Sequence, residues 1–255
     1  MNAATPWILP QDERPEARER LFCIPYAGGA AGVFRSWQEQ IAPQIEVVSV
    51  ELPGRGTRFA EPLRSDLMQL VGELRSGIDD WLDKPFALFG HSVGAAIAFE
   101  LARIFEREGN GDLLRLFVSG QRALHLPDPH PPLHNLPDDE LIEELRHLDG
   151  TPEELLADPE LLELFLPILR ADLTAGETYR FSAGEPLSVP ISAFGGMQDE
   201  EVSPEEVNEW LIHTTAECRI RMFDGGHFFL NSALSEMLES IADDLAHATG
   251  TSDAP

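Results

Sequence analysis

The stretch PFALFGHSVGAAIAFE, residues 85–100, constrains the fold of this chain more than any other. Its apolar residues 86–89 predict a short buried strand, and the apolar run after the glycines predicts a helix. Gly90, Ser92 and Gly94 lie between the two as G-x-S-x-G. In a sharp strand-to-helix turn, the residues two before and two after the serine must be small. We therefore interpret Ser92 as a candidate nucleophile, although the pattern alone also fits a glycine-flanked loop around an ordinary surface serine.

Apolar runs of strand length alternate with helix patterns over much of the chain. Strand patterns occupy residues 20–24, 45–50, 86–89, 115–119, 189–194 and 219–223. Amphipathic helix patterns occupy residues 33–41 and 66–82, and a further helix follows Ser92. Strands that alternate with helices build a mostly parallel sheet with helices on its faces. The sequence therefore predicts an α/β fold, and 255 residues are enough for one such domain with an insertion.

The alternation stops between about residues 121 and 187. A proline-rich linker at 125–134 is followed by helix patterns at 138–148, 153–156 and 160–179. Thr151-Pro152-Glu153-Glu154 has the form of a capping box with proline at the first helical position. Because strand patterns resume afterwards, we expect one domain, residues 1–255, with a helical cap inserted at about 121–187. Most of its apolar side chains are expected to pack as core, and a few to form a wall for an acyl chain.

Two further residues occupy positions where such a fold keeps its chemistry. Asp199 lies between a strand end and the capping box at 203–206, and His227 follows two glycines after the last strand. The order Ser92, Asp199, His227 is that of the α/β-hydrolase triad. In that triad the histidine takes the serine proton, and the aspartate fixes the histidine tautomer and stabilises the imidazolium. Sequence neighbours remain alternatives: Asp224, Glu200 and Glu201 for the acid, and His91, which the turn is expected to direct elsewhere, for the base.

The early glycine-rich loop, PYAGGAAG at residues 25–32, follows the first strand. It contains neither a complete G-x-G-x-x-G nor a G-x-x-x-x-G-K-[ST] phosphate loop. In a serine hydrolase, a loop at this place supplies one backbone N–H of the oxyanion hole, beside the N–H of the residue after the nucleophile. We predict Ala27 and Val93 as these donors, with a purely structural turn as the alternative.

Acidic residues outnumber basic residues by 45 to 18, which gives a formal net charge of -27. Such a charge repels nucleic acid and anionic membranes, so neither is expected as a partner. The N-terminal residues lack a basic segment followed by an apolar one, and no apolar run is long enough to span a bilayer. We expect a soluble cytoplasmic protein.

The metal-ligand residue types give little support for a metal site. Cys23 and Cys218 lie in apolar strand patterns and are expected to be reduced core residues. The linker histidines His125, His130 and His134 are separated by prolines, and a single loop of this kind seldom presents a closed site. We therefore expect neither a metal nor a bound cofactor.

Five stretches together resemble the type II thioesterases that accompany polyketide synthases and nonribosomal peptide synthetases. They are PYAGGA from Pro25, ELPGRGTR from Glu51, GHSVGA from Gly90, GGMQDEEV from Gly195 and DGGHFFL from Asp224. Many members carry methionine at the position of Val93 and histidine at that of Tyr26. The first difference keeps a backbone donor, whereas the second changes a side chain of the oxyanion loop.

The resemblance implies an α/β-hydrolase fold whose helical insertion acts as a mobile lid. It also implies an editing activity, in which acyl or aminoacyl groups are hydrolysed from the phosphopantetheine arm of carrier domains and stalled assembly lines are freed. Ser92 would be acylated by the thioester, and water activated by His227 would then release the acid. The substrate itself carries the phosphopantetheine, and carrier domains are the implied partners.

Carrier domains are usually acidic, as is this chain, so docking is expected to use an apolar patch or a local basic patch around Arg55, Arg58 and Arg64. Arg55 and Arg58, the two arginines of the turn from Leu52 to Pro62, could instead pair with local carboxylates. Other activities remain open. A carboxylesterase or lipase would use the same triad, a chain-terminating thioesterase shares the fold, and an idle hydrolase could serve as a binding protein.

Overall fold

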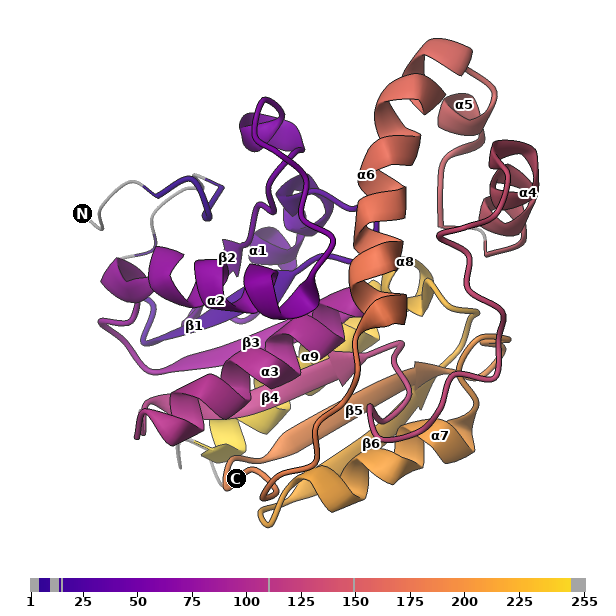
Figure 1. Ribbon diagram of the computed structural model, residues 1–255. Helices are drawn as coiled ribbons and strands as arrows, with labels where there is room; N and C mark the ends of the chain where they lie inside the picture. Colours follow the sequence, from indigo (N-terminus) through magenta and orange to yellow (C-terminus); the bar gives the residue numbers. More distant parts are fainter. Residues whose placement is uncertain (1–4, 10–13, 15, 110, 149, 249–255) are drawn as a thin grey trace.

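The computed structural model describes residues 5–9, 14, 16–109, 111–148 and 150–248. At its centre is a six-stranded sheet of order β2-β1-β3-β4-β5-β6, in which every neighbouring pair is parallel (Figure 1). The strands are β1 (Glu19–Ile24), β2 (Ile45–Ser49), β3 (Phe86–His91), β4 (Leu113–Ser119), β5 (Ile191–Gly196) and β6 (Cys218–Phe223). The predicted α/β fold with a mostly parallel sheet is confirmed, and the strand ends differ from the predicted ones by only a few residues.

Some helices cover both faces of this sheet, and others form an insertion between β4 and β5. They are α1 (Trp37–Gln40), α2 (Leu67–Gly77), α3 (Val93–Arg107), α4 (Asp138–Leu148), α5 (Glu153–Leu156), α6 (Pro159–Thr178), α7 (Pro204–Asn208), α8 (Phe229–Ser232) and α9 (Leu234–Ala248). Single 3-10 turns occupy Ala31–Phe34, Gly56–Arg58, Asp79–Trp81 and Glu209–His213.

Two predicted helices are shorter in the structure than in the sequence patterns. In place of one helix over 33–41, the structure has a 3-10 turn and the four residues of α1. The backbone becomes extended at Ile41, two residues before Pro43. The pattern at 66–82 predicts a longer helix than the structure has, because α2 ends at Gly77. A Cβ added at Gly77 would lie 2.0 Å from the Trp7 ring. Close packing of Trp7 therefore requires glycine, and glycine weakens the helix at that point.

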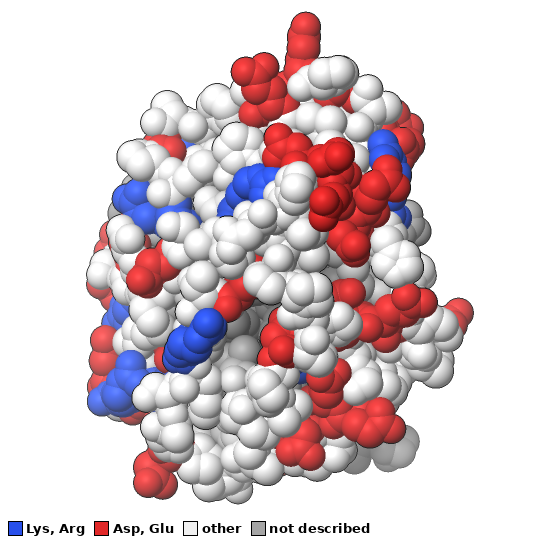
Figure 2. Space-filling model, turned by 45° about the vertical axis from the view of Figure 1, so that its right-hand side comes forward, with Lys and Arg blue, Asp and Glu red and all other residues white. Residues whose placement is uncertain are grey.

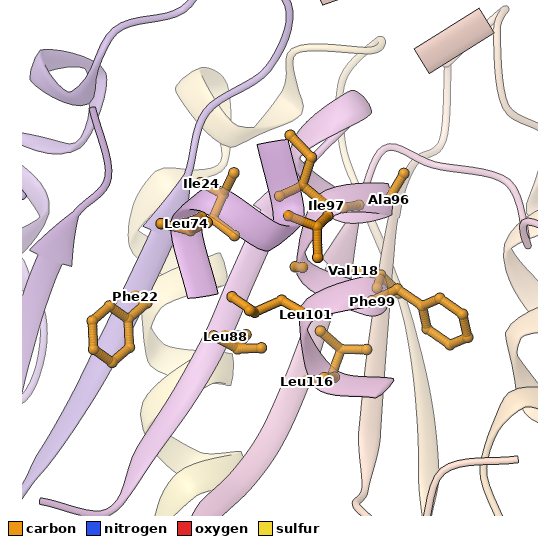
Figure 3. Close-up of a cluster of buried hydrophobic side chains, with 14 of the residues drawn as sticks. Phe22, Ile24, Leu74, Leu88, Ala96, Ile97, Phe99, Leu101, Leu116 and Val118 are labelled. Carbon is orange, nitrogen blue, oxygen red and sulfur yellow. The ribbon is translucent and has the colours of Figure 1, made fainter. Parts of the chain in front are cut away.

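Alternating side chains of each strand supply two separate cores. In β1, Phe22 and Ile24 join the core beneath α2 and α3, whereas Leu21 and Cys23 join the core beneath α1 and α9. Figure 3 shows the first core, where α3 packs its apolar side chains onto the middle of the sheet. Both faces of the inner strands are thus buried, which explains why these strands are largely apolar, whereas the edge strand β6 alternates apolar residues with arginines.

Helices α4, α5 and α6 lie between β4 and β5 in the sequence and rise from the sheet as a separate unit (Figure 1). We call α4 to α6 the helical insertion. Its own small core consists of Leu141, Leu145, Leu156, Leu166 and Leu169. The Asp158 side chain caps α6 by accepting from the N–H groups of Glu160 and Leu161.

The predicted capping box at residues 151–154 is wrong. Pro152 itself is the N-cap of α5, in an extended conformation, and no side chain caps this four-residue helix. By contrast, the box at Ser203 and Glu206 is present, with both reciprocal hydrogen bonds formed. Among the described residues, no helix is both long and apolar enough to cross a lipid bilayer.

Candidate active site

Ser92 lies in the sharp turn between the end of β3 and the start of α3. Its φ of 54° is the single positive φ of a non-glycine residue in the part of the chain that the structure describes. A Cβ at Gly90 would lie 2.0 Å from the Gly94 carbonyl oxygen, and one at Gly94 would lie 2.5 Å from the carbonyl oxygen of Ile24. Only glycine fits at these two positions, as the sequence pattern predicted. The strained conformation at Ser92 places its side chain at the N-terminus of α3, where helix dipoles favour negative charge.

Asp199 and His227 come together because β5 and β6 are parallel neighbours and each residue follows the end of its strand. Nδ1 of His227 lies 2.9 Å from Oδ2 of Asp199. The other carboxylate oxygen, Oδ1, accepts from the backbone N–H groups of Glu201 and Val202. The Asp199 side chain is 0% exposed. Its orientation is therefore fixed from both sides, with one oxygen left for the histidine.

The sequence neighbours proposed as alternatives to this pair lie elsewhere. Glu200 is exposed and contacts His147 of α4 on the surface, and Asp224 is exposed as well. Glu201 contributes its carbonyl oxygen to Arg122. Of the four candidate acids, the structure thus brings only Asp199 to His227.

His91, the remaining alternative base, is completely buried beneath the turn. Its Nδ1 lies 2.9 Å from Oγ of Ser119, and its ring centroid lies 5.2 Å from that of His227. Burial, reinforced by the nearby His227, lowers the pKa of His91 well below its usual value. His91 is therefore neutral and packs behind His227 as a structural residue.

Two cavities meet at Ser92 and His227, which line both of them. The larger, of about 290 Å³, lies under the helical insertion and is mainly apolar. Its walls include Tyr26, Phe165 and Phe228. The smaller, of about 170 Å³, is more polar; Gln121, Arg122, Asp128, Glu177 and Tyr179 are among its lining residues. A reacting group at Ser92 thus has an apolar cavity on one side and a more polar one on the other. We call them the apolar and the polar cavity.

The early glycine loop borders both cavities through Ala27. The Gly28 N–H donates to Oδ2 of Asp172 at 2.8 Å, and the Gly29 N–H donates to the Tyr26 carbonyl at 2.9 Å. Both of these N–H groups are engaged within the protein. Ala27 stays the predicted donor of this loop, and Val93, the first residue of α3, stays the predicted second donor.

The predicted basic docking patch is wrong for two of its three arginines. Arg55 is buried and forms a two-point ion pair with Asp172 of α6. Arg58 is also buried, pairs with Glu61, and places its guanidinium 4.0 Å from the centroid of the Trp7 ring. Arg64 pairs with Glu73. A guanidinium needs partners to be buried, and this acidic chain supplies them.

Asp172 was not among the predicted site residues, and Arg55 pairs with this distant carboxylate rather than with a local one or with a docking partner. The two residues are 117 positions apart, in a helix and a turn with no shared local pattern. Two faint signals existed: an aspartate in the largely apolar middle of the 160–179 helix, and an arginine between two glycines in a turn.

The linker histidines engage protein groups individually. His125 contacts His213 at 2.9 Å, and His134 pairs with Glu177. In the described ranges, no three His, Cys, Asp or Glu side chains are grouped so that they could hold a metal ion. Figure 2 brings forward the right-hand side of Figure 1, where α4 and α5 lie, and Asp and Glu cover more of this face than Lys and Arg. The first turn of α4 alone carries Asp138, Asp139 and Glu140.

Comparison with known proteins identifies the family of the chain. The thioesterase domain family model matches residues 19–246. The linear gramicidin dehydrogenase LgrE of Brevibacillus parabrevis is 42% identical over 94% of this chain and 92% of its own length. The gramicidin S biosynthesis protein GrsT of Aneurinibacillus migulanus is 41% identical over 94% and 93%.

Among solved structures, the type II thioesterase BorB from the borrelidin biosynthetic cluster superposes with a TM-score of 0.87. It is 39% identical in sequence, and the match covers 96% of this chain and 100% of that one. The six-stranded sheet with flanking helices is accordingly an α/β-hydrolase fold. The chain belongs to the thioesterase family and, within it, to the type II thioesterases.

Proposed function

We propose that this protein hydrolyses acyl or aminoacyl thioesters from the phosphopantetheine arms of carrier domains in polyketide or nonribosomal peptide synthesis. One observation carries the proposal: Ser92, in its strained turn, and the Asp199-paired His227 line an apolar and a polar cavity at once. A thioester on a pantetheine arm has the matching form, with an acyl group on one side of the carbonyl and an amide-bearing arm on the other.

In the proposed mechanism, Oγ of Ser92 attacks the thioester carbonyl while His227 takes the serine proton through Nε2. The tetrahedral intermediate places its oxyanion near the N–H groups of Ala27 and Val93. As this intermediate collapses, the C–S bond breaks and His227 protonates the departing thiolate. Asp199 keeps the proton of the neutral ring on Nδ1, so that Nε2 is free to act as the base.

The resulting acyl-enzyme is an oxyester on Ser92. Water gives a proton to His227 and attacks the ester carbonyl, and collapse of the second intermediate returns the proton to Ser92 and frees the carboxylic acid. The apolar cavity would hold the acyl group throughout. The polar cavity would receive the pantetheine amides through groups such as Gln121 and Glu177.

The Ser92, His227 and Asp199 chemistry needs no metal or cofactor of its own, and we propose none. One relative is called a dehydrogenase, but residues 28–32 here read GGAAG and do not complete a G-x-G-x-x-G fingerprint. We further propose a single domain, 1–255, whose insertion at about 121–187 is the lid. A cytoplasmic location fits the two free thiols, Cys23 and Cys218.

Mass spectrometry of acyl-loaded holo carrier protein tests the proposal. The carrier, loaded with acetyl or a longer acyl group, is incubated with the wild type and with Ser92→Ala. We expect the wild type alone to return the free holo carrier, and to cleave simple oxyesters poorly. A carrier that stays loaded while oxyesters are cleaved would identify a general esterase and reject the carrier assignment. With a carrier that bears a hydroxyacyl or aminoacyl chain, release of a cyclised product would identify a chain-terminating enzyme.

A further inference from the structure

We propose that Asp172, in the helical insertion, is a positioning residue that holds the oxyanion loop in its reactive conformation. Asp172 lies in α6, and its side chain is 2% exposed. Its Oδ2 accepts the Gly28 N–H at 2.8 Å, one residue beyond the predicted donor Ala27. The inference rests on the proposed function in one respect, namely that the loop stabilises an oxyanion.

The contact fixes the backbone around Ala27 from both sides. On the C-terminal side, the Gly28 N–H is held by Asp172. Across the turn, the Gly29 N–H closes onto the Tyr26 carbonyl at 2.9 Å. Because peptide units are planar, these two bonds restrict the rotations that would turn the Ala27 N–H away from the substrate. An oxyanion hole acts through donors that need no reorganisation during the reaction, so such restriction bears directly on rate.

Arg55 in turn holds Asp172. Its guanidinium bridges both carboxylate oxygens, with Nη2 donating to Oδ1 at 2.7 Å. The same Nη1 that contacts Oδ2 also reaches the Gly29 carbonyl at 3.3 Å. Two-point pairing of arginine with a carboxylate fixes direction as well as distance. Arg55, Asp172 and the loop therefore form one buried unit, which joins the second-strand turn, the helical insertion and the oxyanion loop.

The same part of α6 also shapes the substrate site. Phe165, Leu169 and Leu173 line the apolar cavity, while Asp172 lines the polar one. Gly28, with a φ of +75°, lies so close to α6 that an added Cβ would be 2.8 Å from the Phe165 ring. One helix thus walls the acyl site and supports the loop that faces the reacting carbonyl. Catalytic geometry accordingly depends on α6 being seated on the loop.

Kinetics can separate this positioning role from a purely structural ion pair. Asp172→Ala, Asp172→Asn and the double variant Arg55→Met/Asp172→Leu are compared with the wild type, and Glu163→Ala, on the exposed side of α6, is the matched control. The double variant replaces the buried pair with apolar residues, an exchange that proteins often tolerate without loss of stability. The readouts are the melting temperature, kcat and KM on a small acyl thioester, and the rate at which a fluorophosphonate labels Ser92.

We expect Asp172→Ala to lower kcat about 100-fold with KM changed less than about threefold, since losing one oxyanion donor costs on the order of 10²- to 10³-fold. The labelling rate should fall in parallel, because the phosphonyl oxygen uses the same donors. Asp172→Asn keeps an acceptor for Gly28 and should recover at least part of the loss. The double variant should melt near the wild type and still show the low kcat.

Wild-type kcat in a folded Asp172→Ala, or activity that returns together with stability in the double variant, would overturn the inference. If Asp172→Ala fails to fold, the kcat and melting temperature of the double variant by themselves test the inference. Because labelling and small thioesters involve no carrier, failure of the carrier assignment leaves this test intact. A wild type that neither labels at Ser92 nor cleaves any ester would instead reject the proposed function.

Discussion

Oδ2 of Asp199 lies 2.9 Å from Nδ1 of His227, while Oδ1 accepts two backbone N–H groups from the following turn. The two backbone N–H bonds to Oδ1 determine how the asparagine side chain of Asp199→Asn would be oriented. Its carbonyl oxygen would take the Oδ1 position, and its NH₂ would face Nδ1 of His227. The ring would then carry its proton on Nε2 and could not accept the proton of Ser92. We expect kcat to fall on the order of 10⁴-fold with little change in melting temperature.

Glu200→Gln is the matched control for that variant. Glu200 is adjacent to Asp199 but is exposed and contacts only His147 among the interactions described. We expect its kcat to stay within about twofold of the wild type, because an exposed contact of this kind contributes little. Equal losses in the two variants, measured with the same thioester, would mean that the Asp199 contact has no special part in catalysis.

Replacement of glycine by alanine should have opposite effects on the unfolding free energy at Gly94 and at Gly72. An alanine Cβ at 94 would lie 2.5 Å from the carbonyl oxygens of Ile24 and Pro25, which belong to the backbone and cannot move aside alone. We expect Gly94→Ala to cost on the order of 3 kcal/mol of unfolding free energy and to abolish activity. Gly72 lies exposed within α2 with nothing within 4 Å of an added Cβ. Gly72→Ala should stabilise the protein by about 0.5–1 kcal/mol. Thermal unfolding of both variants measures the difference.

Asp244 of α9 ties that helix to β5 and β6 by accepting from Ser192, Arg219 and Arg221. Burial raises its pKa, but the hydrogen bonds from Arg221, Ser192 and Arg219 outweigh this and bring the pKa to about 2. The folded-state pKa is thus below the unfolded value of roughly 4. The stabilisation is present above pH 4 and is lost as the pH falls toward 2.

Asp244→Asn should therefore lower the unfolding free energy by about 2 kcal/mol at pH 7. The gap between wild type and variant should narrow below pH 4. Urea unfolding at pH 7, 5, 4 and 3 measures this gap. The neighbouring Asp243→Asn, on the exposed side of α9, serves as the control and should follow the wild-type pH profile. A constant gap between the Asp244 variant and the wild type at every pH would show that the carboxylate charge contributes nothing.

The net charge of -27 and the acidic face of the insertion predict an unusual salt response. An acidic carrier domain is repelled at low ionic strength, and salt screens that repulsion over roughly 10 Å at 0.1 M. We expect kcat/KM for an acidic acyl-carrier to rise several-fold between about 20 mM and 200 mM salt. A neutral acyl thioester of N-acetylcysteamine should change less than about twofold over the same range. A carrier rate that falls with salt would reveal an attractive basic surface instead.

The parts of the site that follow strand ends could be predicted from the sequence. Ser92, Asp199 and His227 each lie in the turn that follows a strand pattern, and parallel strands bring their carboxyl ends to one edge. The contact of Asp199 with His227 therefore needed no knowledge of the packed structure. The inner strands were predictable because both faces of the sheet are buried there, so that these strands are largely apolar, whereas the edge strand β6 has the alternating pattern of a half-buried strand.

The parts that depend on contacts between distant segments could not be predicted. Arg55 was considered either as a docking residue or as the partner of a local carboxylate, yet the carboxylate that pairs with it and buries it lies 117 positions away. The end of α2 at Gly77 depends on the Trp7 ring, which lies 70 residues earlier in the chain. The wrong prediction of a capping box at 151–154 shows that local patterns can also mislead, since a proline such as Pro152 can occupy the N-cap as readily as the first helical turn.

The turn at Ser92 is held by three strands that are distant in sequence. Its N–H donates to the Ser119 carbonyl at the end of β4, and Gly94 packs against the carbonyls of Ile24, the last residue of β1, and of Pro25. A peptide or truncated fragment that contains the whole G-x-S-x-G motif should therefore be inert. During refolding, Ser92 should regain its reactivity toward the fluorophosphonate only when β1, β3 and β4 have paired. The rate at which labelling returns would therefore report the rate at which this part of the sheet assembles.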